Sequence, residues 1–171
     1  MENMQITTEE RLLALLLSKK MTVTTAESCT GGLIASRIVN VPGSSAALMQ
    51  GLVTYSNEAK MRYLGVREET LRAHGAVSEE TAFEMASLGA KNAGTDVCIA
   101  STGIAGPGGA TPGKPVGLVY IAAAVGEKCT VKKLQLSGSR REIREQAAEE
   151  ALLLAIELLQ DTRYLKSDHK G

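Results

Sequence analysis

Short apolar runs rich in β-branched residues alternate with segments of helical periodicity along this chain. The apolar runs cover residues 21–26, 47–56, 96–102, 116–125 and 129–138. The helical segments cover about 8–20, 33–43, 58–66, 79–94 and 139–160. Helices between buried strands are typical of a parallel sheet covered on both faces, whereas the last two strands predict a hairpin. The pattern therefore predicts an α/β fold: a three-layer α/β/α sandwich with a mainly parallel mixed sheet of about five strands.

Local signals mark the ends of two of these helices. Thr7 and Glu10 form a capping-box pattern ahead of RLLALLLSKK, so a first helix is expected to end near Lys20. Ser78 is expected to cap the helix over 79–94, and Gly94 suits the left-handed position that ends it.

Length and composition predict one folded domain. The 171 residues are 44% apolar, with no linker or repeat, so we expect one domain over 1–171, with a core over about 8–160 and a polar tail over 161–171. Nineteen basic and nineteen acidic residues cancel and only 3% are aromatic, so nucleic-acid binding is not expected. The apolar run RLLALLLSKK is too short to span a bilayer, so no membrane association is expected.

The cysteines predict neither disulfides nor a metal site. Cys29, Cys98 and Cys129 are odd in number, widely spaced and without a Cys-x-x-Cys pair or nearby histidines. We therefore expect no bound metal, and a reducing cytoplasm as the location.

The stretch TTAESCTGG, residues 24–32, joins a predicted strand to a predicted helix. Ser28 near the helix N-terminus is a candidate nucleophile, because the helix dipole favours developing negative charge by about 0.3–1 kcal/mol. An N-cap role for Ser28 or Thr30 is the alternative. Gly31 and Gly32 cost roughly 1 kcal/mol each relative to alanine, which indicates that something approaches the backbone closely. Cys29 is the weaker nucleophile candidate because no set of histidine partners accompanies it.

A serine nucleophile needs a base, and neither histidine is well placed for it. His169 lies in the polar tail and His74 in a predicted loop. Lys60 in TYSNEAK is the remaining candidate if burial lowers its pKa from about 10.4, and with Tyr55 beside it would form a proton-relay pair. A solvated lysine on an ordinary helix is the alternative.

The loop STGIAGPGGATPGKPVG, residues 101–117, is rich in glycine and follows a predicted strand. Its amides suit an anion or an oxyanion, although a flexible hairpin-like loop accounts for it equally well. Pro115 stands where a phosphate loop has the magnesium-binding Ser or Thr, and a strand follows, so a magnesium nucleotidase is not predicted. GIAGPGG also lacks the G-x-G-x-x-G spacing of a dinucleotide-binding loop.

Seven motifs occur in a fixed order over about residues 8–160: AESCTGG, VTYSNEAK, LGV, HGAVSEET, STGIAGPGG, KPVGLVY and SGSRREIREQA. In order and spacing they resemble the C-terminal domain of the CinA competence/damage-inducible protein family. The chain resembles the stand-alone form of that domain, because 171 residues leave no room for the molybdopterin-binding-like domain of full-length members. The resemblance implies hydrolysis of nicotinamide mononucleotide to nicotinate mononucleotide and ammonia, a step of pyridine nucleotide salvage, without metal or other cofactor.

The resemblance also implies roles for individual residues. Ser28 would attack the carboxamide carbon, Lys60 would take its proton and later serve the leaving ammonia, and Tyr55 would relay or orient. Arg140 and Arg144 lie four residues apart and so share a helix face. They suit the 5′-phosphate, unless they pair with nearby acids. Family members often carry an acidic residue where Ser139 stands. The implied substrate-binding residues are Thr30, Gly31, Gly32, Asn57, Thr102, Gly103, Ala105, Gly106, Arg140 and Arg144.

Two other functions remain open at this level. One is a non-catalytic nucleotide-sensing or partner-binding module linked to competence or DNA damage. The other is an oligomeric scaffold built from the apolar terminal helices. A homo-oligomer is expected, with RLLALLL as a possible subunit interface, although the same helix would be equally well buried within the monomer.

Overall fold

The structure is a computed structural model that describes residues 5–161. Most of the predicted polar tail, His169 included, lies outside the described residues. The elements are α1 (Thr8–Lys19), β1 (Val23–Glu27), α2 (Leu33–Val39), the 3₁₀ turn η1 (Ser44–Ala46), β2 (Leu48–Val53), α3 (Asn57–Ala59), the π-helical turn η2 (Lys60–Leu64), α4 (Glu68–His74), α5 (Glu79–Ala93), β3 (Val97–Gly103), β4 (Leu118–Val125), β5 (Lys128–Gln135) and α6 (Arg140–Gln160).

The five strands form one sheet in the order β2-β1-β3-β4-β5. Strand β1 pairs in parallel with β2 and β3, whereas β4 pairs antiparallel with both β3 and β5. Because two antiparallel pairings separate β5 from β3, β5 runs with the first three strands and only β4 is reversed. The predicted mainly parallel mixed sheet is confirmed.

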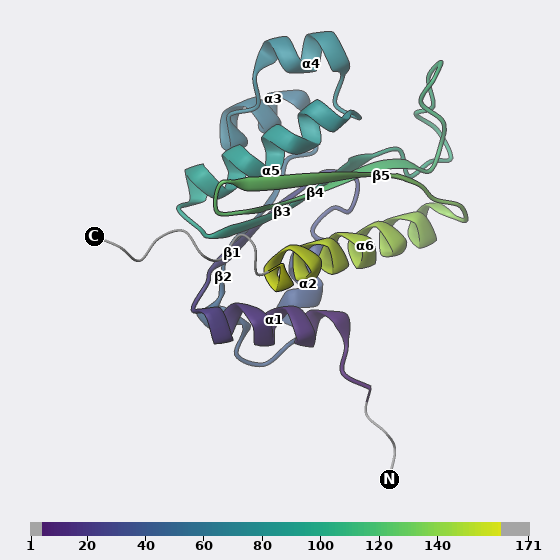
Figure 1. Cartoon of the computed structure of the whole chain (residues 1–171). Helices are drawn as coiled ribbons and strands as arrows, with labels where there is room; N and C mark the ends of the chain where they lie inside the picture. The colour runs from purple at the N-terminus through teal and green to yellow at the C-terminus, as the bar shows by residue number, and fades with distance from the viewer. Residues whose placement is uncertain (1–4, 162–171) are drawn as a thin grey trace.

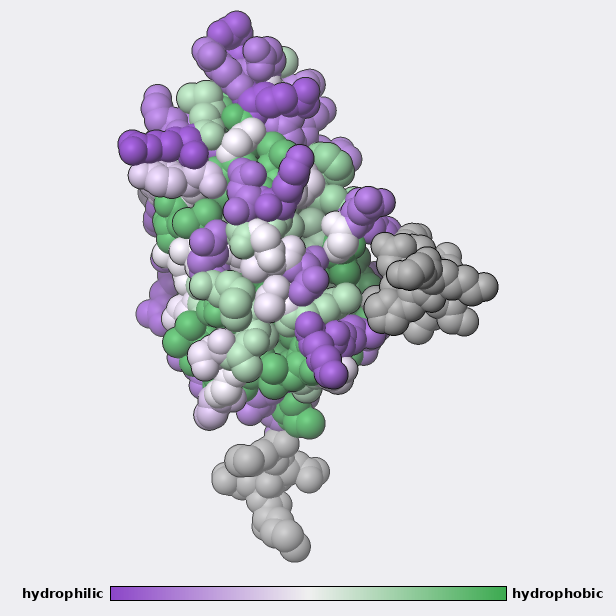
Figure 2. Space-filling model, turned by 90° about the vertical axis from the view of Figure 1, so that its left-hand side faces the viewer, coloured by the Kyte–Doolittle hydropathy of each residue, from purple (hydrophilic) through white to green (hydrophobic). Residues whose placement is uncertain are grey.

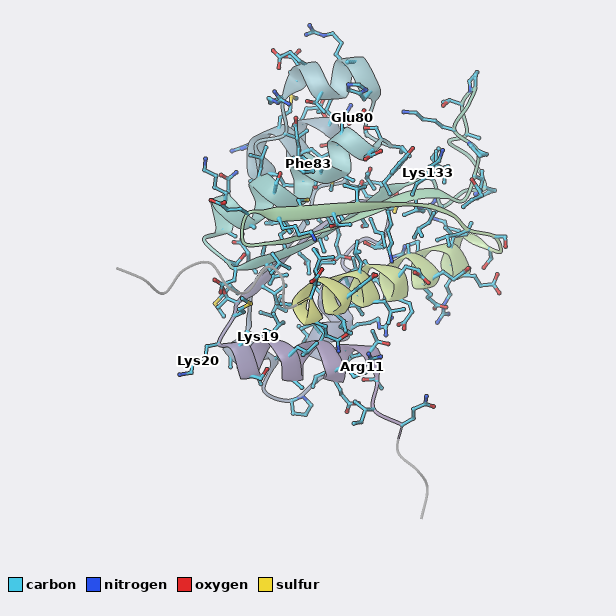
Figure 3. The ribbon with its side chains drawn as sticks, in the orientation of Figure 1. Arg11, Lys19, Lys20, Glu80, Phe83 and Lys133 are labelled. Carbon is cyan, nitrogen blue, oxygen red and sulfur yellow. The ribbon has the colours of Figure 1, made fainter. Side chains whose placement is uncertain are left out.

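Helices cover both faces of the sheet, which confirms the three-layer sandwich (Figure 1). Helices α3, α4 and α5 lie on one face, and α2 and α6 lie on the other, with α1 packed against α6. Leu12, Leu13 and Leu16 of α1 are buried in the core on that side. The apolar stripe of RLLALLL is therefore buried within the monomer, and Figure 3 shows Arg11 and Lys19 on this outer helix.

The predicted helix ends agree with the structure. Thr7 and Glu10 form the capping box of α1, Ser78 Oγ accepts from the Thr81 amide, and Gly94 ends α5 at φ 66°. Within residues 5–161, no helix combines the length and the apolar character needed to cross a membrane.

Strand β2 departs from the prediction of a buried strand. It lies at the edge of the sheet, and its Met49 and Val53 side chains are 49% and 51% exposed. An apolar run by itself does not distinguish a central strand from an edge strand. On the side of the molecule seen in Figure 2, hydrophobic atoms lie among hydrophilic ones.

Candidate active site

The three loops singled out in the sequence meet at one edge of the sheet. They follow β1, β2 and β3, and the carboxyl ends of parallel strands share an edge where ligands commonly bind. A pocket of about 270 Å³ opens there. It is lined by Ser28, Cys29, Tyr55, Gly103, Ile104, Ala105, Gly106, Gly108, Gly109 and Arg140.

Ser28 and Lys60 form a buried pair beside this pocket. Lys60 Nζ donates to Ser28 Oγ at 3.0 Å and to the carbonyl oxygen of Thr54 at 2.7 Å. Lys60 is 1% exposed and Ser28 is 8% exposed, so the alternative of a solvated lysine is wrong. Burial lowers the pKa of Lys60 to about 8, against an opposing influence of Cys29. A fraction of Lys60 is thus neutral near pH 7 and can accept the serine proton.

The π-helical turn η2 begins at Lys60, and its buried side chains are those of Lys60 and Leu64. The preceding helix α3 is capped by Ser56 Oγ, which accepts from the Ala59 amide at 3.0 Å. The wider turn that follows ends at Gly65, with φ 80°. Single π-helical turns are frequent at functional sites, and the helical periodicity of residues 58–66 did not indicate this one.

The expectation that Ser28 or Thr30 caps α2 is wrong. The N-cap of α2 is Gly32, at φ 96°, and it has no side-chain hydrogen bond. The amides of Ile34 and Ala35 instead donate to the fully buried carboxylate of Glu27, at 2.8 and 3.1 Å. These first-turn amides are therefore not available to a substrate. Sequence reasoning missed Glu27, although an acid shortly before a helix is the available signal.

The backbone conformation of the loop explains its two glycines more directly than contact with a ligand does. Gly31 and Gly32 have φ of 61° and 96°, which glycine adopts without strain. The Gly31 amide donates to the Ser28 carbonyl at 3.0 Å. Arg144 donates to the carbonyls of Cys29 and Thr30 at 3.1 and 2.8 Å, so its guanidinium holds the loop. Arg140 and Arg144 also line a second pocket together, so a phosphate shared by the two arginines stays a prediction.

Tyr55 lines the pocket but does not form the expected relay pair. Its side chain is 62% exposed, and its hydroxyl accepts from Arg140 Nη2 at 2.9 Å. Arg140 Nη1 donates to the Gly106 carbonyl at 2.8 Å. Tyr55 and Arg140 thus line the pocket as a bonded pair, whereas the Lys60 amine bonds to Ser28 and Thr54. Arg141 forms an ion pair with Glu145 on the exposed side of α6, as helical spacing predicts.

Like Arg144, three other expected substrate-binding side chains do not line this pocket. The Thr102 hydroxyl donates to the Ala76 carbonyl at 2.7 Å, and Thr102 is 1% exposed. Thr30 is fully buried, and Asn57 is exposed at the start of α3. These residues share the motifs of the pocket, but the fold directs them elsewhere.

Glycine is required in the third loop by the adjacent strand. A β carbon on Gly103 would lie 2.6 Å from Val119 Cγ2, and one on Gly106 would collide with Val116. Close packing against β4 and the segment before it therefore accounts for these two glycines, in addition to any ligand contact.

Cys29 lines the pocket beside Ser28 but is a poor nucleophile. Burial raises the pKa of its thiol to about 11, so the thiol stays protonated near neutral pH. Of the two adjacent candidates, Ser28 alone has a base within hydrogen-bonding distance.

Fold and site together define a class: a three-layer α/β protein with a serine–lysine pair at the carboxyl ends of its parallel strands. The family model of the CinA C-terminal domain matches residues 5–159, so the chain belongs to this family.

Relatives and solved structures agree with this assignment. A CinA-like protein of Kosmotoga olearia is 60% identical over 144 residues, which are 84% of this chain and 35% of that protein. A putative competence-damage inducible protein of Clostridium acetobutylicum is 54% identical over 136 residues, 80% of this chain and 33% of that protein. This chain thus spans about a third of the length of these curated relatives.

Two crystal structures have the same fold. The competence/damage inducible protein CihA of Agrobacterium tumefaciens has a TM-score of 0.87 and 41% identity, and the match covers 90% of this chain and 94% of that chain. A CinA superfamily protein of Klebsiella pneumoniae has a TM-score of 0.85 and 36% identity, over 90% of this chain and 98% of that chain.

Proposed function

We propose that this protein hydrolyses the carboxamide of nicotinamide mononucleotide to give nicotinate mononucleotide and ammonia. Ser28 is the nucleophile and Lys60 the base. The observation that carries the proposal is the 3.0 Å hydrogen bond between Lys60 Nζ and Ser28 Oγ, in a lysine with 1% exposure. A non-catalytic binding module has no need to bury a cationic side chain against a hydroxyl, because that burial costs stability.

The chemistry follows from this pair. An amide is a poor electrophile, so an activated nucleophile is needed. Neutral Lys60 takes the proton of Ser28 as Oγ bonds to the carboxamide carbon, and returns it to the nitrogen as ammonia leaves. Water, deprotonated by Lys60, then attacks the acyl-serine ester. The acid product is released with Ser28 restored.

Backbone amides of the pocket suit the oxyanion of the tetrahedral intermediate. Among the described residues, the amides of Cys29, Ala105 and Gly106 have no protein acceptor, and all three residues line the pocket. The amide after the nucleophile and an amide from a facing loop are the donors that acyl-transfer sites use. Loss of one such donor typically costs about 100- to 1,000-fold in rate.

Arg140 is the better placed of the two arginines for the 5′-phosphate. It lines the same pocket as Ser28, and its guanidinium has donors beyond the two that contact Gly106 and Tyr55. A guanidinium fork suits a phosphate group.

The test is ammonia release from nicotinamide mononucleotide by the purified protein, with a chelator present. Wild type should release ammonia, and Ser28→Ala should lose about 1,000-fold or more in kcat while still binding the nucleotide. Lys60→Ala should lose activity to a similar extent. A folded wild type that binds the nucleotide without ammonia release would contradict the proposal and indicate a nucleotide-sensing module.

A further inference from the structure

We infer that Glu27 is a positioning residue of this site, because its buried carboxylate ends a chain of hydrogen bonds that fixes the loop carrying Ser28. The inference rests on the proposed serine–lysine chemistry. It concerns a side chain that does not line the pocket and has no contact with a substrate there.

The Glu27 carboxylate accepts hydrogen bonds from three groups in the segment that follows it. Thr30 Oγ1 donates at 2.7 Å, and the amides of Ile34 and Ala35 donate at 2.8 and 3.1 Å. Glu27 is the last residue of β1 and is fully buried. The loop from Ser28 to Gly32 is thereby folded around one anion, with its strand end and its helix end held together.

The hydrogen bond between Thr30 and Ser101 has only one consistent direction. A hydroxyl has one proton, and that of Thr30 goes to the carboxylate. Ser101 Oγ, 2.6 Å from Thr30 Oγ1, must therefore be the donor to Thr30. The Ser101 carbonyl also accepts from the Ser28 amide at 3.0 Å. The chain therefore runs from Ser101 on β3, through Thr30, to Glu27.

The main chain of the same residue positions the base. The Thr54 amide donates to the Glu27 carbonyl at 2.8 Å, and the Thr54 carbonyl accepts from Lys60 Nζ at 2.7 Å. The side chain of Glu27 thus holds the loop of the nucleophile, while its backbone holds the acceptor of the base. Glu27 therefore contacts both the loop that carries Ser28 and the residue that accepts from Lys60.

Replacing Glu27 by glutamine preserves the volume but breaks the chain. Each carboxylate oxygen accepts a backbone N–H, and a glutamine amide has only one oxygen. The new NH₂ group must face either the Ala35 amide or the Ile34 amide, donor against donor. Buried unpaired donors are costly, so the loop has to shift.

The experiment measures the reactivity of Ser28 directly, with a small fluorophosphonate as the probe. Ser28 Oγ forms a bond to phosphorus, the P–F bond breaks, fluoride leaves, and the serine proton passes to Lys60. A displacement of about 1 Å can cost about 100-fold, so Glu27→Gln should be labelled about 10- to 100-fold more slowly than wild type. An unchanged labelling rate would overturn the inference.

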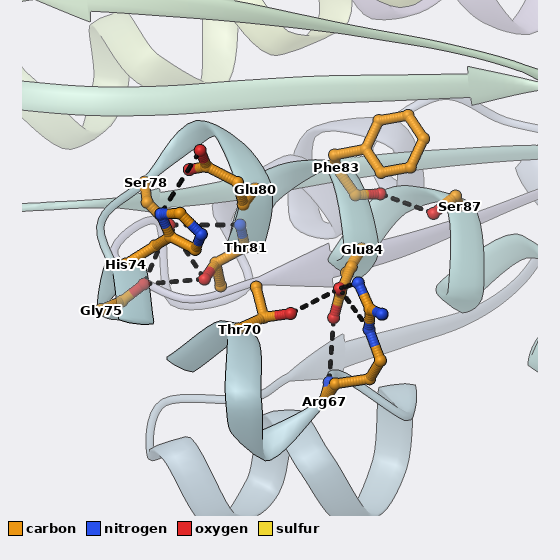
Figure 4. A network of polar contacts seen from close by, with 10 residues as sticks. All are labelled: Arg67, Thr70, His74, Gly75, Ser78, Glu80, Thr81, Phe83, Glu84 and Ser87. Atoms are coloured by element: carbon orange, nitrogen blue, oxygen red, sulfur yellow. Dashed lines mark hydrogen bonds and ion pairs between the residues drawn. The ribbon is translucent and has the colours of Figure 1, made fainter. Parts of the chain in front are cut away.

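The matched control is Glu84→Gln, and Figure 4 shows the native Glu84 with its hydrogen-bond partners. Glu84 is also a buried carboxylate with several donors, since it accepts from Thr70 and from the backbone and side chain of Arg67. It lies on α5, outside the candidate site. The control should lose stability yet be labelled at the wild-type rate.

The pH dependence of labelling distinguishes positioning from general loosening. If Glu27 only positions the loop, Lys60 remains buried, and labelling of Glu27→Gln still rises through about pH 8. If the substitution opens the site to water, the pKa of Lys60 returns toward 10.5 and the rise moves up with it. The second result would overturn the positioning role.

Two substitutions of Thr30 provide a second test if Glu27→Gln does not fold. Thr30→Val removes the hydroxyl that links Glu27 to Ser101, whereas Thr30→Ser retains it. Thr30→Val should be labelled about 10-fold more slowly and Thr30→Ser near the wild-type rate. Equal rates would overturn the inference.

Labelling of wild-type Ser28 without ammonia release from nicotinamide mononucleotide would contradict the proposed function alone.

Discussion

The Arg144 guanidinium occupies the space beside Gly31, although 112 residues separate the two on the chain: a β carbon on Gly31 would be 3.1 Å from Arg144 Nη2. The same guanidinium donates to the carbonyls of Cys29 and Thr30. The loop of Ser28 is therefore held by α6 on one side and by Glu27 on the other.

Gly31→Ala should impair both stability and turnover. Its φ of 61° costs an L-residue about 1–2 kcal/mol, and the added methyl group displaces Arg144. Gly94→Ala is the control, because Gly94 has a similar φ of 66° with no atom within 4 Å of the added carbon. Chemical unfolding should show a loss of stability for both variants, larger for Gly31→Ala because it also displaces Arg144, and kcat should fall for Gly31→Ala only. A normal kcat for Gly31→Ala would contradict the proposed role of the loop.

Arg140→Ala and Arg144→Ala should affect different kinetic parameters. Arg140 lines the pocket, so its loss should raise KM by about 10- to 100-fold, the equivalent of a charged hydrogen bond. Arg144 contacts the loop carbonyls, so its loss should lower kcat by about 10-fold with a smaller change in KM. Steady-state kinetics with nicotinamide mononucleotide measures both, with the exposed Arg141→Ala as the control. The reverse assignment would place the phosphate on Arg144.

Activity should rise with pH through about 8 and then level off. Lys60 acts as a base only when neutral, and burial lowers its pKa to about 8, so the active fraction grows as pH passes this value. The measurement is kcat/KM between pH 6 and 10. A profile that is flat across this range would exclude Lys60 as the base.

Lys60 should also make stability depend on pH. Its pKa is about 8 in the folded state against 10.5 when solvated, so the unfolded chain binds more protons between these values. Stability relative to Lys60→Met should therefore rise by roughly 3 kcal/mol from pH 8 to pH 10.5, since one pKa unit corresponds to about 1.4 kcal/mol. Urea unfolding of both proteins across this range measures the difference, and a constant difference would contradict the burial of a charged lysine.

The fold was predictable because its signals are local. The capping box at Thr7, the cap at Ser78 and the left-handed Gly94 each depend on a few neighbouring residues, and all three are present. The exposure of β2 was not predictable, because an edge position depends on which strands pair.

The candidate site was likewise predictable from the sequence only in part. Ser28 and Lys60 were identified from residue type and motif resemblance, and the structure brings them together. The hydroxyls of Tyr55 and Thr102 were assigned to the site by the same reasoning, yet they bond to Arg140 and Ala76. Motif membership locates a residue near a site, but a side chain's partner is set by what packs across from it.

The sequence by itself thus determined the class of fold, the three loops and the two residue types that can carry the chemistry. Only the tertiary structure decided that Lys60 is buried, that Glu27 holds the first turn of α2, and that Arg144 braces the loop of Ser28. The physical reason is range: caps and periodicity arise within a few residues, whereas desolvation and long-range hydrogen bonds exist only after distant segments have packed.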